Sequence, residues 1–336
     1  MKIKLDLSGF ELFWNIVEKI ETSTEPSEEE WISLFNTPGY QALTTTEFNE
    51  DFFKQSFLAV FDPERKEKLD RLLEGKTKRY LRYYLQVKKN KEIYEKNVKM
   101  IKDRWESLNE TIYARAVAFL PYKEPEKDPT VSIVIFDVDA RGYSTIAVDA
   151  IFTSRIEDFV SITAHEVHHF YRNQLLEYEK ENVEEEDKEL IWILNQIQSE
   201  GIADHIDKDY FIYGRIETSF PKAYVKHFTE SVDQAPEIIN EINTLFQKYK
   251  QSELSTNELG SEVKKIVPLA GHPLGYYMTK IIIKNAHFDD LIRIVGNPFK
   301  FFKLYNKSVV SERENLSVYS ETTIEIIEDF EKKYVK

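Results

Sequence analysis

The spacing of hydrophobic residues predicts that the first third of the chain is helical. Apolar side chains recur every three or four residues, which places them on one face of an α-helix. The clearest segments with this spacing are residues 9–20, 31–35 and 76–119. Ser27, followed three residues later by Glu30, is the pattern of a capping box, and Asp62-Pro63 is typical of a further helix start. We interpret the aromatic residues in these stripes as helix packing.

The period of the pattern changes near residue 129. Three prolines fall within residues 121–129, and proline cannot continue a helix. Two β-rich runs follow, 131–138 and 145–152, joined by the turn-like segment 139–142 and interpreted as a hairpin or as two neighbouring strands. We therefore expect a mainly α (α+β) fold with a small sheet. It is either divided into a helical N-terminal domain (1–128) and a second domain (129–336), or formed as one continuous α+β body.

Two helices that follow the predicted sheet carry the candidate chemistry. The first is expected from about residue 154 to residue 178 and contains His165-Glu166-Val167-His168-His169. Two histidines four residues apart project from one helix face about 6 Å apart, so they can share one metal ion. Glu166 would then lie beside the open coordination position, where it can move a proton.

A third ligand is expected on the next helix, which starts near residue 187. Its apolar residues and the carboxylates of Glu200 and Asp204 recur at steps of three and four, which predicts a single seam. A buried carboxylate is costly unless it is paired, and coordination of a cation offsets that cost. We therefore predict Glu200 as the ligand, with the rivals Glu189, Asp204, His205 and Asp207 left open. Asp204 is also predicted to accept the ring N–H of a ligand histidine, and His168 to support the site from outside it.

Composition restricts these possibilities. The 336-residue chain has no cysteine, so a metal must be held by His, Asp or Glu, and His₂Glu ligation favours Zn²⁺. The formal net charge of −14 argues against nucleic acid or an anionic membrane surface as a partner. Asp6 and Glu11 interrupt any secretion signal, and no stretch has the length of a membrane span, so we expect a cytoplasmic protein.

The residues resemble known zinc peptidases. HExxH followed on a later helix by ExxxD is similar to the gluzincin class, of which thermolysin is the best-known member. More closely, residues 165–169, 200–204 and 275–278 resemble a bacterial family described as zinc-dependent peptidases, with similarity over roughly residues 145–283. The resemblance implies a thermolysin-like catalytic core, with His165, His169 and Glu200 as ligands and Glu166 as general base. Metzincins differ, because they need Gly and His where this chain has Arg172 and Leu175.

Two further groups of residues are candidates for contact with the substrate. In gluzincins a Tyr or His from a C-terminal element commonly meets the oxyanion, so His272, Tyr276 and Tyr277 are candidates, with buried aromatic packing as the alternative. Ala147, Val148, Asp149 and Ala150 precede the metal helix, where a strand could bind an extended peptide by strand addition, or could simply be core.

We therefore expect zinc-dependent hydrolysis of a peptide bond in a peptide or protein substrate. Two alternatives stay open at this point. One is a non-catalytic helical binding protein whose metal is structural and closed by four protein ligands. The other is a metal hydrolase that acts on a non-peptide bond, since water activation is common to both reactions.

Overall fold

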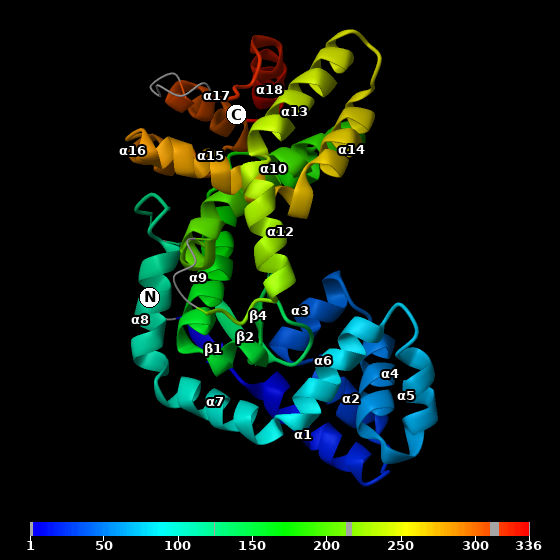
Figure 1. The fold of residues 1–336 in the computed structure, drawn as a ribbon. Helices are drawn as coiled ribbons and strands as arrows, with labels where there is room; N and C mark the ends of the chain where they lie inside the picture. Colours follow the sequence, from blue (N-terminus) through cyan, green and yellow to red (C-terminus); the bar gives the residue numbers. More distant parts are fainter. Residues whose placement is uncertain (1–2, 124, 213–216, 310–315, 336) are drawn as a thin grey trace. The chain divides into compact units, whose positions relative to one another are not determined.

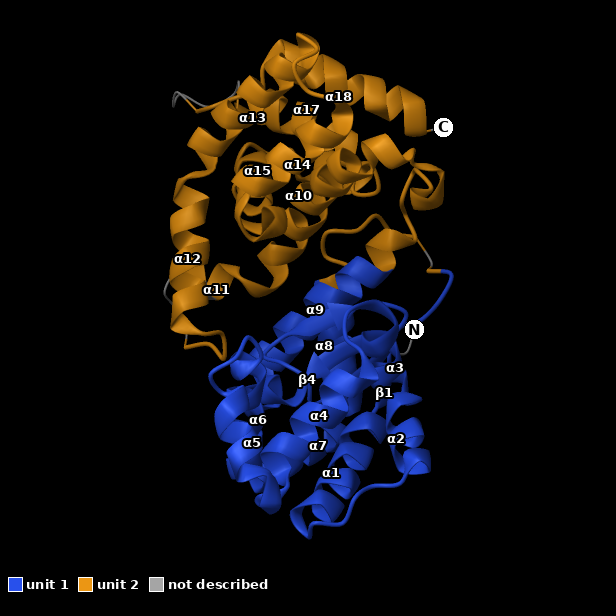
Figure 2. Ribbon diagram, turned by 90° about the vertical axis from the view of Figure 1, so that its right-hand side faces the viewer, with its two compact units in different colours: residues 1–115, 126–170 blue, residues 116–125, 171–336 orange. Residues whose placement is uncertain are grey.

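The computed structural model describes residues 3–123, 125–212, 217–309 and 316–335. Over these residues the fold is mainly α with one small four-stranded sheet, as predicted (Figure 1). The chain divides into two compact units, shown in different colours in Figure 2. Unit 1 holds residues 1–115 and 126–170, and unit 2 holds residues 116–125 and 171–336. The boundary expected at 128/129 does not coincide with this division.

Unit 1 begins with short helices that bury their aromatic faces. The Ser27 capping box is confirmed, because the Ser27 hydroxyl accepts from the Glu30 N–H while the Glu30 carboxylate accepts from the Ser27 N–H. Asp62 likewise accepts from the Glu64 N–H at 2.9 Å and starts a 3₁₀ turn. The helical elements up to the sheet are α1 (Ser8–Glu21), α2 (Glu28–Phe35), α3 (Pro38–Thr46), α4 (Glu50–Phe61), η1 (Pro63–Arg65), α5 (Lys66–Leu72), α6 (Lys78–Lys89), α7 (Lys91–Asp103) and α8 (Trp105–Ala116).

The sheet has the strand order β1-β2-β4-β3. Its strands are β1 (Lys4–Asp6), β2 (Thr130–Val134), β3 (Ala140–Gly142) and β4 (Ile146–Asp149). Strands β2 and β4 are parallel neighbours, so the structure selects the second of the two predicted arrangements and not the hairpin. β1 also pairs in parallel with β2, whereas β3 runs antiparallel to β4 at the edge of the sheet. The segment predicted as a turn is therefore an edge strand.

This order corrects the prediction that residues 147–150 bind a substrate by strand addition. β4 is hydrogen-bonded to β2 on one side and to β3 on the other, so it has no edge to which a peptide could add. The side chains of Ala147, Val148, Asp149 and Ala150 are all fully buried. These residues form core, which was the alternative interpretation of the run.

After β4 the chain forms η2 (Ala150–Ser154) and then α9 (Ile156–Asn173), which carries the histidine motif. The boundary between the units falls within α9, after Phe170. The remaining elements belong to unit 2: η3 (Lys180–Asn182), η4 (Glu185–Asp187), α10 (Lys188–Asp207), α11 (Asp209–Ile212), α12 (Lys222–Asp233), α13 (Ala235–Lys250), α14 (Thr256–Ile266), η5 (Pro268–Gly271), α15 (His272–Lys284), α16 (Phe288–Arg293), α17 (Pro298–Val309) and α18 (Glu321–Tyr334).

Glycines bring other helices of unit 2 unusually close to α10. A Cβ added at Gly275 on α15 would lie 1.8 Å from the Ile197 carbonyl oxygen, and one added at Gly260 on α14 would lie 2.3 Å from the Leu190 nitrogen. Figure 1 shows α14 and α15 beside α10. The backbones of α14 and α15 therefore lie in direct contact with the backbone of α10, the helix that carries Glu200. None of the helices in the described part of the chain is long and apolar enough to cross a membrane.

Candidate metal centre

Helix α9 brings His165 and His169 together in unit 1. Their Nε2 atoms are 3.0 Å apart, and their rings meet at 77°. Two nitrogens bound to one tetrahedral Zn²⁺ at 2.0–2.1 Å lie roughly 3.3 Å apart, so this pair fits a shared zinc ion with little adjustment. Both histidines are buried, as predicted, and His168 is fully buried with its ring 6.1 Å from that of His169.

Glu166, between the two histidines, lies against the edge strand of the sheet. A Cβ added at Gly142 on β3 would be only 2.6 Å from the Glu166 Oε2 atom. Glu166 is 9% exposed, so its carboxylate is nearly enclosed. The lack of a side chain at Gly142 therefore leaves the space that the carboxylate occupies. Sequence reasoning missed this contact, because a three-residue strand of Ala, Arg and Gly carries no readable hydrophobic pattern.

In unit 2, Glu200 and Asp204 lie one turn apart on α10 beside His272 of α15. The His272 Nδ1 atom is 2.9 and 3.0 Å from the two Asp204 carboxylate oxygens, and its Nε2 atom is 3.5 Å from Glu200 Oε2. Burial lowers the pKa of His272, but the carboxylates of Asp204 and Glu200 raise it, with a net increase. The three residues also offer donor atoms within 4.8 Å of one another, so they form a group that could hold a metal.

Asp204 has a second cationic partner. Lys208 is buried, and its Nζ atom lies 2.9 Å from Asp204 Oδ1 and 2.7 Å from Asp207 Oδ2. Burial lowers the pKa of Lys208, but the two carboxylates raise it well above its ordinary value. The lysine therefore stays charged and compensates the two buried aspartates. The predicted role of Asp204 toward a ligand histidine stays a prediction.

The segment before His272 holds an uncommon backbone conformation. Leu269, Ala270 and Gly271 all have positive φ, of 48°, 52° and 101°. Left-handed conformations cost non-glycine residues about 1 kcal/mol or more each. Gly271 also lies against α10, where an added Cβ would be 3.0 Å from the Ile197 nitrogen. This strained turn delivers His272 to the first position of α15, directly beside Asp204.

The two predicted tyrosines have other surroundings. The Tyr276 hydroxyl donates to Asp209 at 2.6 Å, and its ring stacks on His205 at a centroid distance of 4.1 Å. His205 Nδ1 lies 3.1 Å from the same Asp209 carboxylate. Tyr277 packs against Tyr305. Tyr276 and His205 therefore form a group around Asp209 that sequence reasoning did not find.

The rival ligands have partners of their own in unit 2. Glu189 pairs with Lys264 at 3.0 Å, Asp207 with Lys208, and His205 with Asp209. His165 and His169 belong to unit 1 and Glu200 belongs to unit 2. The complete ligand set therefore stays a prediction.

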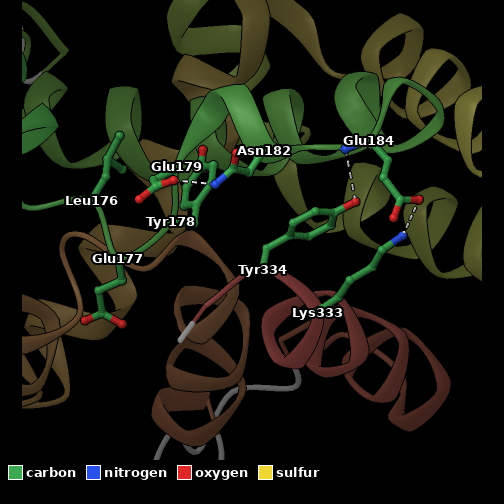
Figure 3. Close-up of a pocket in the computed structure, with 8 residues that line it drawn as sticks. All are labelled: Leu176, Glu177, Tyr178, Glu179, Asn182, Glu184, Lys333 and Tyr334. Atoms are coloured by element: carbon green, nitrogen blue, oxygen red, sulfur yellow. Dashed lines mark hydrogen bonds and ion pairs between the residues drawn. The ribbon is translucent and has the colours of Figure 1, made fainter.

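Unit 2 also contains a cavity of about 320 Å³, lined by Leu176, Glu177, Tyr178, Glu179, Asn182, Glu184, Lys333 and Tyr334 (Figure 3). It lies between the segment that follows α9 and the end of α18. Lys333 reaches Glu184 at 2.7 Å and Asp187 at 2.8 Å, while the Tyr334 hydroxyl donates to Asp187 at 2.6 Å. These contacts bind Lys333 and Tyr334, at the end of α18, to the segment before α10.

Together these features define a mainly α protein with a candidate centre for a divalent metal on an HExxH helix. Residues 31–314 match the family described as "Putative zinc dependent peptidase", and the chain belongs to that family. The match is longer than the predicted range of residues 145–283, because it extends into the N-terminal helices. No match is found among curated proteins or among solved structures.

Proposed function

We propose that this protein hydrolyses peptide bonds with a zinc ion held by His165, His169 and Glu200. The observation that carries the proposal is the imidazole pair of α9, with Nε2 atoms 3.0 Å apart and the Glu166 carboxylate against Gly142. The family description as zinc dependent supports the choice of metal. His₂Glu with one open position is the ligand set of catalytic rather than structural zinc.

Zinc supplies Lewis-acid chemistry when bound: it polarises the carbonyl of the scissile bond and lowers the pKa of water. Glu166 is the general base in our proposal. Its carboxylate accepts the proton from the attacking water and delivers it to the nitrogen of the leaving amine. The near-complete burial of Glu166 supports this role, since it limits the positions that the carboxylate can take.

His272 is the donor that we assign to the developing oxyanion. Asp204 binds its Nδ1 atom, which fixes the ring and leaves an N–H on Nε2. The two carboxylates favour the protonated imidazole, and a charged donor stabilises an oxyanion more strongly than a neutral one. Tyr276 fits this role less well, because its hydroxyl already donates to Asp209.

We place the peptide substrate along β3 instead of β4. Among the strands that the structure describes, β3 has a strand partner on one side only. An extended peptide can add to such an edge through main-chain hydrogen bonds. Because Gly142 of β3 touches Glu166, a peptide on this edge would pass close to the proposed base.

Glu166→Gln tests the mechanism. Glutamine keeps the size of the side chain but cannot accept a proton, so we expect zinc content to be retained. We expect kcat/KM on a peptide library to fall by about 10²–10⁴-fold. Unchanged cleavage by this variant would eliminate Glu166 as the base. Cleavage of esters but not of peptides by the unmodified protein would favour the non-peptide hydrolase.

A further inference from the structure

Arg172 of α9 is fully buried, and among the described residues no carboxylate lies at ion-pair distance from it. Its Nε donates to the Val295 carbonyl at 3.1 Å, and one terminal nitrogen donates to Gln198 Oε1 at 2.7 Å. Within the described residues, the other terminal nitrogen has no hydrogen-bond partner. A buried charge without a counter-ion is costly, so its presence calls for an explanation.

The electrostatic surroundings of Arg172 involve a proposed zinc ligand. Burial lowers the pKa of Arg172 to about 10, while Tyr178 and Glu200 act in the opposite direction. The guanidinium therefore stays charged near neutral pH.

Gln198 of α10 is the partner of Arg172 and is fully buried as well. Its amide nitrogen donates to the Ile294 carbonyl at 2.9 Å and to the Asn297 carbonyl at 3.1 Å. Gln198 therefore accepts a hydrogen bond from Arg172 of α9 and donates hydrogen bonds to residues 294–297. Arg172 Nε donates to a carbonyl of the same segment.

The segment 294–297 in turn holds the chain just after α9. The Glu177 N–H donates to the Gly296 carbonyl at 3.0 Å. A Cβ added at Gly296 would lie 1.9 Å from the Leu175 carbonyl oxygen, so the two backbones are in direct contact. The end of α9, the middle of α10 and this segment thus form one buried hydrogen-bonded network within unit 2.

We propose that Arg172 and Gln198 are positioning residues for the zinc ligands. Arg172 follows His169 by three residues on α9, and Gln198 precedes Glu200 by two residues on α10. A bond between these two side chains therefore joins the two ligand-bearing helices within about one turn of the ligands. This inference rests on the ligand set of the proposed function.

The two bonds that the residue at position 172 donates favour arginine over lysine. A guanidinium is a planar fork that can donate to the Val295 carbonyl and to Gln198 at the same time, whereas a lysine ammonium is a point charge on a flexible stem. Arg172→Lys keeps the positive charge but removes the planar group that donates both hydrogen bonds at once. Gln198→Met removes the bond and keeps the guanidinium.

The experiment measures zinc affinity by competition with a chromophoric chelator, together with the visible absorption of the Co²⁺-loaded protein. Partners that orient metal ligands typically contribute 10–100-fold to affinity, so we expect Gln198→Met and Arg172→Lys to bind zinc at least 10-fold more weakly, with altered Co²⁺ bands. Thr279→Val, a buried isosteric change in the same unit, is the matched control and should leave both readouts unchanged. Wild-type affinity and spectra in both test variants would overturn the proposal.

Three further variants separate the possible failures. Gln198→Glu can still accept from Arg172 through a charge-assisted bond but cannot donate to the Ile294 and Asn297 carbonyls. Retained zinc affinity in this variant would support the bond between α9 and α10 as the positioning contact. A loss as large as that of Gln198→Met would assign the effect to the donated bonds and overturn the role of the Arg172 bond. His165→Ala and Glu200→Ala test the ligand set itself. If either retains full zinc affinity, the ligand set and the positioning proposal both fail. If both lose zinc while Gln198→Met and Arg172→Lys do not, only the positioning proposal fails.

Discussion

At the scale of single residues, the position of the proposed base Glu166 depends on a glycine at position 142. Gly142 has no Cβ, and the Glu166 carboxylate occupies the space that one would need. The spacing of His165 and His169 could be predicted because helix periodicity is a local property of the sequence. The contact between Gly142 and Glu166 could not, because it depends on which strand lies at the sheet edge.

Gly142→Ala should therefore damage catalysis without damaging the fold. The added methyl group would stand 2.6 Å from Glu166 Oε2, the end of a flexible side chain, whereas the nearest backbone atom, the Glu166 carbonyl oxygen, is 3.4 Å away, so the carboxylate and not the backbone has to shift. We expect unchanged zinc content and thermal stability, with kcat lower by about 10–100-fold, since a displacement near 1 Å can cost that much. Full activity in this variant would show that the carboxylate does not act from this position.

Asp149 shows a different role from the one that its sequence position suggested. Its carboxylate accepts from the Tyr83 hydroxyl and from the Phe136 and Ile151 N–H groups, and it is fully buried. Burial nevertheless raises its pKa to about 8. The aspartate therefore anchors α6 to the end of β4 instead of contacting a substrate.

The raised pKa predicts how stability depends on pH. Between about pH 4 and pH 8 the unfolded chain ionises Asp149 while the folded protein keeps the proton, so rising pH favours unfolding. The effect is at most about 1.4 kcal/mol per pH unit for one group. Asp149→Asn should flatten the pH dependence of the unfolding free energy in this window. An identical pH dependence in the variant and the unmodified protein would contradict the assignment.

At the scale of elements, most helices could be predicted and the sheet order could not. Capping residues, proline positions and apolar spacing are local signals, and they located α1, α2, α9 and α10. β1 was missed because three residues show no pattern, and its partner β2 lies more than a hundred residues later. Parallel pairing of this kind is determined by long-range packing, which no local pattern contains.

The crossing of α10 and α15 is the element contact most sensitive to a small change. Gly201 and Gly275 face each other there, and an alanine Cβ at Gly275 would overlap the Ile197 carbonyl at 1.8 Å. Because backbone cannot yield as a side chain can, we expect Gly275→Ala to destabilise the protein by about 1–3 kcal/mol in chemical denaturation. Gly75→Ala is the control, since its nearest contact is 3.3 Å away. Equal stability of the two variants would refute this close packing.

At the scale of the whole molecule, the two units divide the candidate chemistry between them. His165, Glu166 and His169 lie in unit 1, whereas Glu200, Asp204 and His272 lie in unit 2. The expected boundary at 128/129 followed the change from helical to β-rich sequence. The change in sequence pattern does not mark the boundary between the units, because β1 from the N-terminus is part of the same sheet as β2.

We propose above all that His165, His169 and Glu200 hold one zinc ion. Metal analysis of protein purified without chelator tests this most directly, with the unmodified chain compared with His165→Ala, His169→Ala and Glu200→Ala. We predict about one zinc per chain for the unmodified protein and a loss of most of it in each variant, because catalytic zinc has three protein ligands. An unmodified protein without zinc, or a Glu200→Ala variant that retains it fully, would contradict the account.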